Sequence, residues 1–331
     1  MGLVKWKGKV AIVRASSGVI QPASGFMYPV LMGGEAVIEG EPIIYERNIT
    51  PDVDYDEFAG HNFRFSISGI VPNMNMAGYL WALALGDDSF SVATHTITPD
   101  DDQQYLVVFI DTGLDLGTST PTIPLLGCKI ESLEMEIPFK GFAKCNISGP
   151  GCAIGPLSAA LTPSIPSGAD EKPIGWHSLK DAAGFFKLGL NGVAVAAIGT
   201  PKGLKISYGR PKVEGGLQLN TDQPTQIEDG SARTLAFEFP MEWKGTITNT
   251  SKEIYAAWLA GQRLALDIKG VEGAHSLEIV IPEAKMRVNA LPSIGQADEI
   301  MMGIVQGQAK LDGTNPLVTV TAVDGSGAAY W

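Results

Sequence analysis

The sequence of 331 residues is poor in cysteine, with three copies, Cys128, Cys145 and Cys152. A fold held together by disulfides usually has an even and dense set of cysteines. We therefore expect reduced thiols in a cytoplasm. Long apolar runs are also missing, since none approaches the roughly 20 residues of a membrane span. Met1–Lys9 carries three lysines, but no apolar region of a signal peptide follows it.

Basic residues are in the minority, because 24 Lys and Arg face 36 Asp and Glu, for a net charge of −12. A surface that grips nucleic acid needs lysine and arginine to neutralise phosphates. The composition therefore argues against nucleic-acid binding, although it is compatible with a surface that must avoid such binding.

Recognisable catalytic and metal-binding patterns are missing too. The four histidines have no metal-ligand spacing to each other or to a cysteine: His61, His95, His177 and His275. Asp52, Asp54 and Asp56 begin like a calcium loop, but Glu57 and Phe63 occupy the positions of its glycine and glutamate. An irregular cation site there stays open. No dinucleotide fingerprint, nucleophile elbow or Walker sequence is present. We expect no catalytic residue, no cofactor and no enzyme activity.

Apolar residues are plentiful, at 45%, and 39 glycines and 21 prolines provide turns. This composition favours a mainly β architecture, and the length favours two domains or one large one. The clearest strand is Thr234–Trp243, where large apolar residues alternate with Ala236, Glu238, Pro240 and Glu242. Ser251–Gln262 follows with a helical apolar stripe that includes Leu259, and Gly261 is its expected stop.

The same order of loop, strand and helix occurs earlier in the chain. In Phe63–Val71, the residues Phe63, Phe65, Ile67 and Val71 share a face, and Asn73–Leu85 is a helix that ends at Gly86. Its apolar stripe contains Met76, Leu80 and Leu83. A repeat about one half-chain apart predicts one building block used twice, with Phe65 equivalent to Phe239. Chance similarity of two strand–helix units is the alternative.

The remaining segments extend this repeat. Cys128–Ser148 alternates around a turn at Lys140-Gly141 and predicts a β-hairpin. We expect a matching hairpin from Glu299–Leu311 and Leu317–Val323, and a strand Leu277–Ile281 matching Tyr105–Ile110. Gly149–Pro173 has the composition of a linker. The predicted parts are a first domain (1–155), a linker (156–176) and a second domain (177–331).

Two long, polar segments, Glu35–Gly60 and Arg210–Gly230, precede the two organising strands. Each contains acidic residues and at least one proline or glycine turn. Long excursions of this kind are usually functional. We expect them to stand away from their own domain and to contact another copy.

The chain resembles the tail tube (major tail) proteins of long-tailed bacteriophages with non-contractile tails. The resemblance rests on the helix Asn73–Gly86, on His95–Asp100 followed by Tyr105–Ile110, on Gly127–Ile137 with its return strand, and on Thr234–Gln262. It implies two tandem β-sandwich or half-barrel domains, each flanked by one α-helix. It also implies a structural protein without enzyme activity, located in the virion tail and assembled in the host cytoplasm.

The resemblance further implies the partners. Copies would form a trimeric, pseudo-hexameric ring (a hexamer being the less expected form), and stacked rings would make the tube. A tape measure protein and tail tip or terminator proteins would contact it, and genomic DNA would pass through without specific binding. A barrel of roughly 24 strands would have a diameter of about 50 Å, wide enough for a duplex.

Acidic residues on the lumen wall would repel passing DNA. The candidate lumen-facing residues are Glu134 and Glu136, with Glu238 and Glu242 as further candidates. The competing hypothesis is a two-domain β-sandwich binding module, lectin-like or receptor-binding, of a phage particle. Such a module would present aromatic residues on loops. Eight aromatics here fall instead on the apolar faces of strands and helices: Phe63, Phe65, Tyr79, Trp81, Phe237, Phe239, Tyr255 and Trp258.

Overall fold

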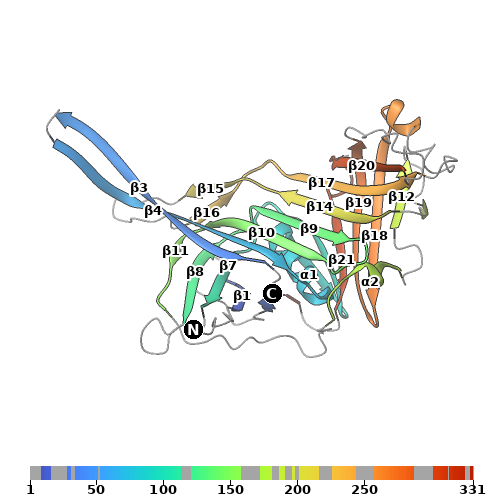
Figure 1. Cartoon of the computed structure of the whole chain (residues 1–331), viewed down its shortest axis with the longest axis horizontal. Helices are drawn as coiled ribbons and strands as arrows, with labels where there is room; N and C mark the ends of the chain where they lie inside the picture. Colours follow the sequence, from blue (N-terminus) through green and yellow to red (C-terminus); the bar gives the residue numbers. More distant parts are fainter. Residues whose placement is uncertain are drawn as a thin grey trace.

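The chain folds mainly into antiparallel β-strands, as the alternating, glycine- and proline-rich sequence predicts (Figure 1). The computed structural model describes residues 9–15, 28–30, 34–50, 53–112, 121–157, 172–180, 186–190, 196–197, 201–215, 226–243, 256–286, 301–311, 313–324 and 329–330.

The described part of the first half contains the strands β1 (Lys9–Arg14), β2 (Tyr28–Val30), β3 (Ala36–Thr50), β4 (Val53–Ile70), β5 (Gly86–Ser91), β6 (Thr94–Pro99), β7 (Leu106–Asp111), β8 (Thr122–Cys128), β9 (Ser132–Pro138), β10 (Lys144–Gly151) and β11 (Ala153–Ile154). The second half forms β12 (Phe186–Leu190), β13 (Ala196–Ala197), β14 (Gly203–Gly209), β15 (Lys212–Gly215), β16 (Gln226–Asp229), β17 (Thr234–Trp243), β18 (Arg263–Glu272), β19 (His275–Met286), β20 (Met301–Ala309) and β21 (Thr319–Val323). The helices are α1 (Met74–Leu85), α2 (Trp176–Lys180) and a short helical turn at 256–259.

Most strands join one 14-stranded sheet, whose main path is β13-β12-β18-β19-β20-β17-β14-β9-β10-β4-β3. A second sheet has the order β11-β8-β7-β1-β2, and β15 and β16 form a separate hairpin. The large sheet combines strands from both halves of the chain, because β9 pairs with β14. The hairpin of β3 and β4 projects far beyond the rest of the molecule in Figure 1.

The two halves share the order of neighbouring strands. In the first half, the smaller sheet runs β2-β1-β7-β8-β11. Strand β11 continues β10 after Cys152, and β10 pairs with β4, which pairs with β3. The order is therefore β2-β1-β7-β8, then β10 with β11, then β4 and β3. In the second half the order is β13-β12-β18-β19-β20-β17-β14. The strands β4 and β17, which carry Phe65 and Phe239, therefore hold equivalent places. The division into two domains stays a prediction, because 158–171 lie outside the described residues.

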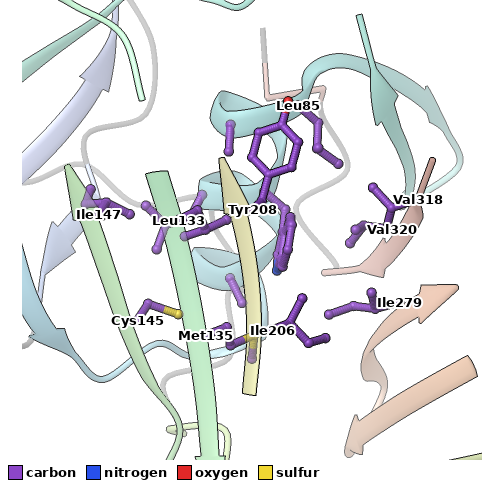
Figure 2. Packing of buried hydrophobic residues seen from close by; sticks show 14 of the residues in the cluster. Leu85, Leu133, Met135, Cys145, Ile147, Ile206, Tyr208, Ile279, Val318 and Val320 are labelled. Carbon is purple, nitrogen blue, oxygen red and sulfur yellow. The ribbon is translucent and has the colours of Figure 1, made fainter. Parts of the chain in front are cut away.

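Helix α1 is the centre of the core. The Asn73 side chain accepts a 2.7 Å hydrogen bond from the Met76 backbone N–H, and Gly86 ends the helix with a φ of 107°. The sequence predicts one apolar stripe, but all twelve helical residues are buried. Figure 2 shows the reason: side chains from β9, β10 and β14 face the helix on one side, and side chains from β19 and β21 face it on another. A helix covered on several sides has no solvent-facing stripe.

Several predicted elements are confirmed with their bounds nearly unchanged. Thr234–Trp243 is β17, and Cys128–Ser148 contains the β9–β10 hairpin, whose turn places Lys140 at a φ of 63°. Gly261 ends the helical turn at 256–259 with a φ of 64°. The earlier part of the predicted second helix, 251–255, lies outside the described residues.

Several expectations are wrong. Ile70, and not Val71, is the buried residue at the end of β4, because Gly69 adopts a φ of 67° and shifts the alternation by one. Leu259 is exposed instead of lying on a buried stripe. Within the predicted linker, Gly149–Gly151 pairs with β4.

The fourth correction concerns the last two strands. β20 pairs with β17 and β19, and β21 pairs with β19 and β6, so they do not form the predicted hairpin with each other. In the shared strand order, the counterpart of β7 is β18. The sequence pattern predicts Leu277–Ile281 as that counterpart, but this segment belongs to β19. Alternation shows that a segment is a strand, but it does not identify the strand that pairs with it.

Candidate assembly surfaces

One face of the large sheet is polar where the two halves meet. A row of paired residues crosses β10, β9, β14, β17 and β20 in the order Lys144, Glu136, Lys205, Glu238 and Gln306. Directly opposite residues on neighbouring antiparallel strands share a face. The row therefore alternates in charge across the junction between the halves.

Hydrogen bonds and an ion pair stabilise this row and join it to the neighbouring row, which contains Glu134 and Asn146. Lys205 Nζ lies 2.9 Å from Glu134 Oε2, and Asn146 Nδ2 donates to Glu134 Oε1 at 3.2 Å. Gln306 Nε2 donates to Glu238 Oε2 at 2.6 Å. The hydrogen bond to Glu134 raises the pKa of Lys205 against a smaller opposing effect of burial, and the charges of Glu134, Glu136 and Glu238 act in the same direction.

The opposite face of these strands is apolar and buried. Leu133 and Met135 of β9, Ile206 of β14 and Phe237 and Phe239 of β17 are at most 2% exposed. The period of two in each strand therefore separates a core face packed toward α1 from the polar face (Figure 2).

The structure brings together three of the four residues that the sequence proposes for a lumen wall. Glu134 and Glu136 lie on β9 and Glu238 lies on β17, separated only by β14. Glu242 lies further along β17, but its side chain is outside the described residues. Sequence reasoning missed Lys205, which sits between these glutamates. Its alternation with Leu204 and Ile206 places it on the polar face, but the pairing of β14 with β9 is not visible in the sequence.

Two described strand pairings join the halves, β9 with β14 and β6 with β21. β9 pairs with β14 over seven residue pairs, from Gly203–Pro138 to Gly209–Ser132. In the second half β14 occupies the place that β3 occupies in the first. Among the described strands, β3 pairs only with β4, so its other edge has no strand partner. An open strand edge presents unpaired N–H and C=O groups to any strand that can add to it.

A buried ionic cluster fastens the β15–β16 hairpin to the first half. Lys129 Nζ lies 2.8 Å from Asp229 Oδ2, and Asp102 contributes a second oxygen at 2.9 Å. Lys212 binds the other oxygen of Asp229 and also the Gln103 side chain. Lys129, Lys212 and Asp229 are at most 3% exposed, so this cluster is a structural part of the interior. The expectation that Arg210–Gly230 stands away from the fold is therefore wrong for its described part, which packs on the first half of the same chain.

The charges in this cluster perturb each other. Burial lowers the pKa of Lys212 to about 8, although Asp229 opposes the shift. Burial also favours a neutral Asp229, but the hydrogen bonds from Lys129 and Lys212 outweigh it and lower the pKa of this carboxyl. Beside the cluster, Arg210 donates to the backbone oxygens of Asp100, Asp101 and Gly230 at 2.6–2.8 Å.

A second buried cluster holds the end of the chain against the first half. His95 on β6 lies between two carboxylates, with Nδ1 3.0 Å from Asp88 Oδ2 and Nε2 3.3 Å from Asp324 Oδ1. The Tyr330 ring stacks on His95 at a centroid distance of 3.7 Å. Burial favours the neutral imidazole, but Asp324 and Asp88 outweigh it and raise the pKa of His95 to about 9. The sequence suggests only an ordinary histidine here, because Asp88 lies on the neighbouring strand β5 and Asp324 is remote in the chain.

Aromatic side chains gather on the surface at the β9–β10 turn. Phe139 is 41% exposed and Phe142 is 55% exposed. Trp176 and His177 of α2 contact their rings edge-on, at 5.2 and 6.1 Å between centroids. Exposed aromatics on a turn are common in binding surfaces.

No group of three metal-ligating side chains occurs among the described residues. Asp52 and the side chains of Asp54 and Asp56 lie outside the described part of the chain. The irregular cation site suggested for these three residues therefore stays a prediction. Within the described ranges, no helix has the length and apolar character needed to cross a membrane. No family model matches the sequence, and no curated protein matches it significantly.

Proposed function

We propose that the protein is a structural subunit of a hollow tube, built from stacked rings of identical copies, like the tail tube proteins that its sequence resembles. In this proposal the tube belongs to a phage tail and conducts DNA. The partners are further copies of the chain, a tape measure protein and tail tip or terminator proteins.

The equivalence of β3 and β14 is the observation that carries the proposal. β14 completes its outer edge with β9 of the same chain, whereas the equivalent edge of β3 is open among the described strands. A second copy that supplies a strand to β3 would repeat the internal junction. Such a contact uses two different surfaces of each copy, and repeated rotation then closes a ring. Ring closure also removes the exposed edge.

The polar face of the sheet is the proposed wall of the lumen. It carries Glu134, Glu136 and Glu238 against Lys144 and Lys205 at the junction of the halves. Because the acids outnumber the lysines by three to two, the wall would repel DNA weakly. The repulsion acts over about 8 Å at physiological salt. DNA would therefore slide without forming stable phosphate contacts.

A binding module of a phage particle is the second candidate. The exposed rings of Phe139 and Phe142 are the observation that favours it. A module that binds another molecule through these rings would not need the open edge of β3.

A proline at position 36 tests the proposal. Ser68 donates its backbone N–H to Glu35 O at 2.8 Å, so the backbone groups of Glu35 face β4. Successive residues point these groups to opposite sides, and the N–H of Ala36 therefore points away from β4. A proline is tolerated on an edge strand when the N–H it removes faces solvent.

The expected result is that Ala36→Pro leaves the melting temperature nearly unchanged and abolishes rings and tubes in negative-stain microscopy. Ala36→Ser keeps the N–H and should assemble like the unchanged protein. Normal assembly of the proline variant would show that β3 does not pair with another copy.

A further inference from the structure

The far part of the long β3–β4 hairpin has no neighbouring strand in the part of the chain that the structure describes. Its strands span 15 and 18 residues, and Figure 1 shows their far ends well away from every other strand. An isolated two-stranded hairpin is at best marginally stable in water. Apolar residues in this hairpin, among them Ile44 and Phe58, are opposite partners across it.

The partner should be cationic. Segment 41–62 carries six acidic residues against Arg47 alone: Glu41, Glu46, Asp52, Asp54, Asp56 and Glu57. Glu46 and Asp56 are direct cross-strand partners. Like charges in that position destabilise a hairpin, so a positive group placed beside them would stabilise it.

A surface with the complementary chemistry lies at the β9–β10 turn. We define the aromatic–lysine patch as Phe139, Lys140, Phe142, Trp176 and Lys202. Lys140 Nζ and Lys202 Nζ lie 5.3 and 4.6 Å from the centre of the Phe139 ring. The patch therefore combines exposed rings with positive charge in a chain of net charge −12.

The aromatic–lysine patch is preformed, because backbone hydrogen bonds hold its two segments together. Trp176 donates its backbone N–H to Gly141 O at 3.0 Å, and Ala143 donates to Ile174 O at 2.7 Å. These bonds join α2 to the turn. At the border of the patch, Glu272 pairs with His177 and Lys172, which limits negative charge there. A preformed surface loses little conformational entropy on binding.

We propose that the acidic β3–β4 hairpin of one copy docks on the aromatic–lysine patch of a neighbouring copy. The far end of the hairpin and the patch are widely separated along the longest axis of the molecule, so one chain cannot satisfy both (Figure 1). The contact is head to tail, so a docked pair keeps one free hairpin on one copy and one free patch on the other. This inference rests on the proposed function only in assuming that copies associate.

Two full-chain variants separate the two sides of the contact. In the hairpin variant, residues 41–62 are replaced by Asn-Gly, which closes a tight turn between the paired residues Gly40 and Phe63. In the patch variant, Phe142→Ser is combined with Lys202→Glu. Leu311→Ser with Lys310→Glu is the matched control, because both residues are exposed and lie outside the patch.

Sedimentation velocity then measures association of each protein alone and of the two variants mixed. The patch variant should self-associate at least about tenfold more weakly than the unchanged protein, as expected when a buried aromatic anchor is lost, and the control should not. When both variants also carry Ala36→Pro, which blocks the proposed edge contact of β3, their mixture should form a 1:1 complex, roughly twice the 35.0 kDa of one chain, and nothing larger.

Unchanged association of the patch variant, or absence of the 1:1 complex, would overturn the inference. Neither result depends on tube formation. If the unchanged protein makes tubes and the patch variant makes them equally well, the inference fails and the proposed function stands. If the 1:1 complex forms but the unchanged protein never makes rings, the docking contact stands and the proposed function fails.

Discussion

Lys129 and Asp229 form a buried ion pair at 2.8 Å that joins the two halves of the chain. Lys129 follows β8 in the first half, and Asp229 ends β16 in the second. The pair therefore couples the β15–β16 hairpin to the sheet junction that the proposed tube requires.

Asp229→Asn should destabilise the protein strongly, by about 3–5 kcal/mol, because it leaves two buried lysines without their shared carboxylate. Asp102→Asn is the control. It removes the other partner of Lys129, but Asp102 is 85% exposed, so its loss should cost at most about 1 kcal/mol. Chemical denaturation measures both values, and equal losses would show that the buried position of Asp229 does not matter.

Stability should also depend on the protonation of His95. The folded pKa of about 9 lies above the ordinary value of 6.5, so the protonated imidazole stabilises the fold. This contribution is complete below about pH 6.5 and is lost as the pH rises through 9. Asp88→Asn removes one of the two carboxylates. The difference in unfolding free energy between the unchanged protein and the variant should be larger at pH 6 than at pH 9.5, and a constant difference would contradict the assignment.

Gly78→Ala should destabilise the protein although it replaces a glycine within a helix. Alanine favours a helix interior by about 1 kcal/mol over glycine. However, a Cβ at position 78 would lie 2.3 Å from Tyr330 Oη and 2.8 Å from Ala322 Cβ. Overpacking of this kind costs about 1–3 kcal/mol, so we expect a net loss. In a Tyr330→Ala background the loss should shrink, and stabilisation of the otherwise unchanged protein would refute the close contact.

Reversing charge on the polar face should slow DNA passage. Glu134→Lys with Glu136→Lys would place two further cations beside Lys205 and Lys144, where they could contact phosphates. We expect assembly to remain largely intact and DNA ejection to slow, most at low salt. Lys205→Gln is the matched control and should not slow ejection. Ejection that is unaffected by the double reversal would argue against a lumen-facing sheet.

Local patterns predicted many of the elements, and tertiary pairing explains what they could not predict. Alternation identified β17 and the β9–β10 hairpin, and the residues Asn73 and Gly86 marked both ends of α1. The pairing of β9 with β14 depends on contacts between remote segments, so the position of Lys205 between Glu136 and Glu238 was not predictable.

The same limit explains the errors. The last two strands alternate like a hairpin, but each pairs elsewhere in the large sheet. The sequence pattern treats Gly69 as an ordinary strand residue. Its positive φ shifts the alternation by one residue, so Ile70 lies in the core in place of Val71. The clusters around Asp229 and His95 collect residues from both halves, and no short sequence motif marks such a cluster.

Negative-stain microscopy of the purified, unchanged protein over a range of concentrations tests the central claim most directly. The open edge of β3 predicts closed rings and stacked tubes with a central lumen wide enough for a DNA duplex. Particles no larger than a single chain at every concentration would contradict the account.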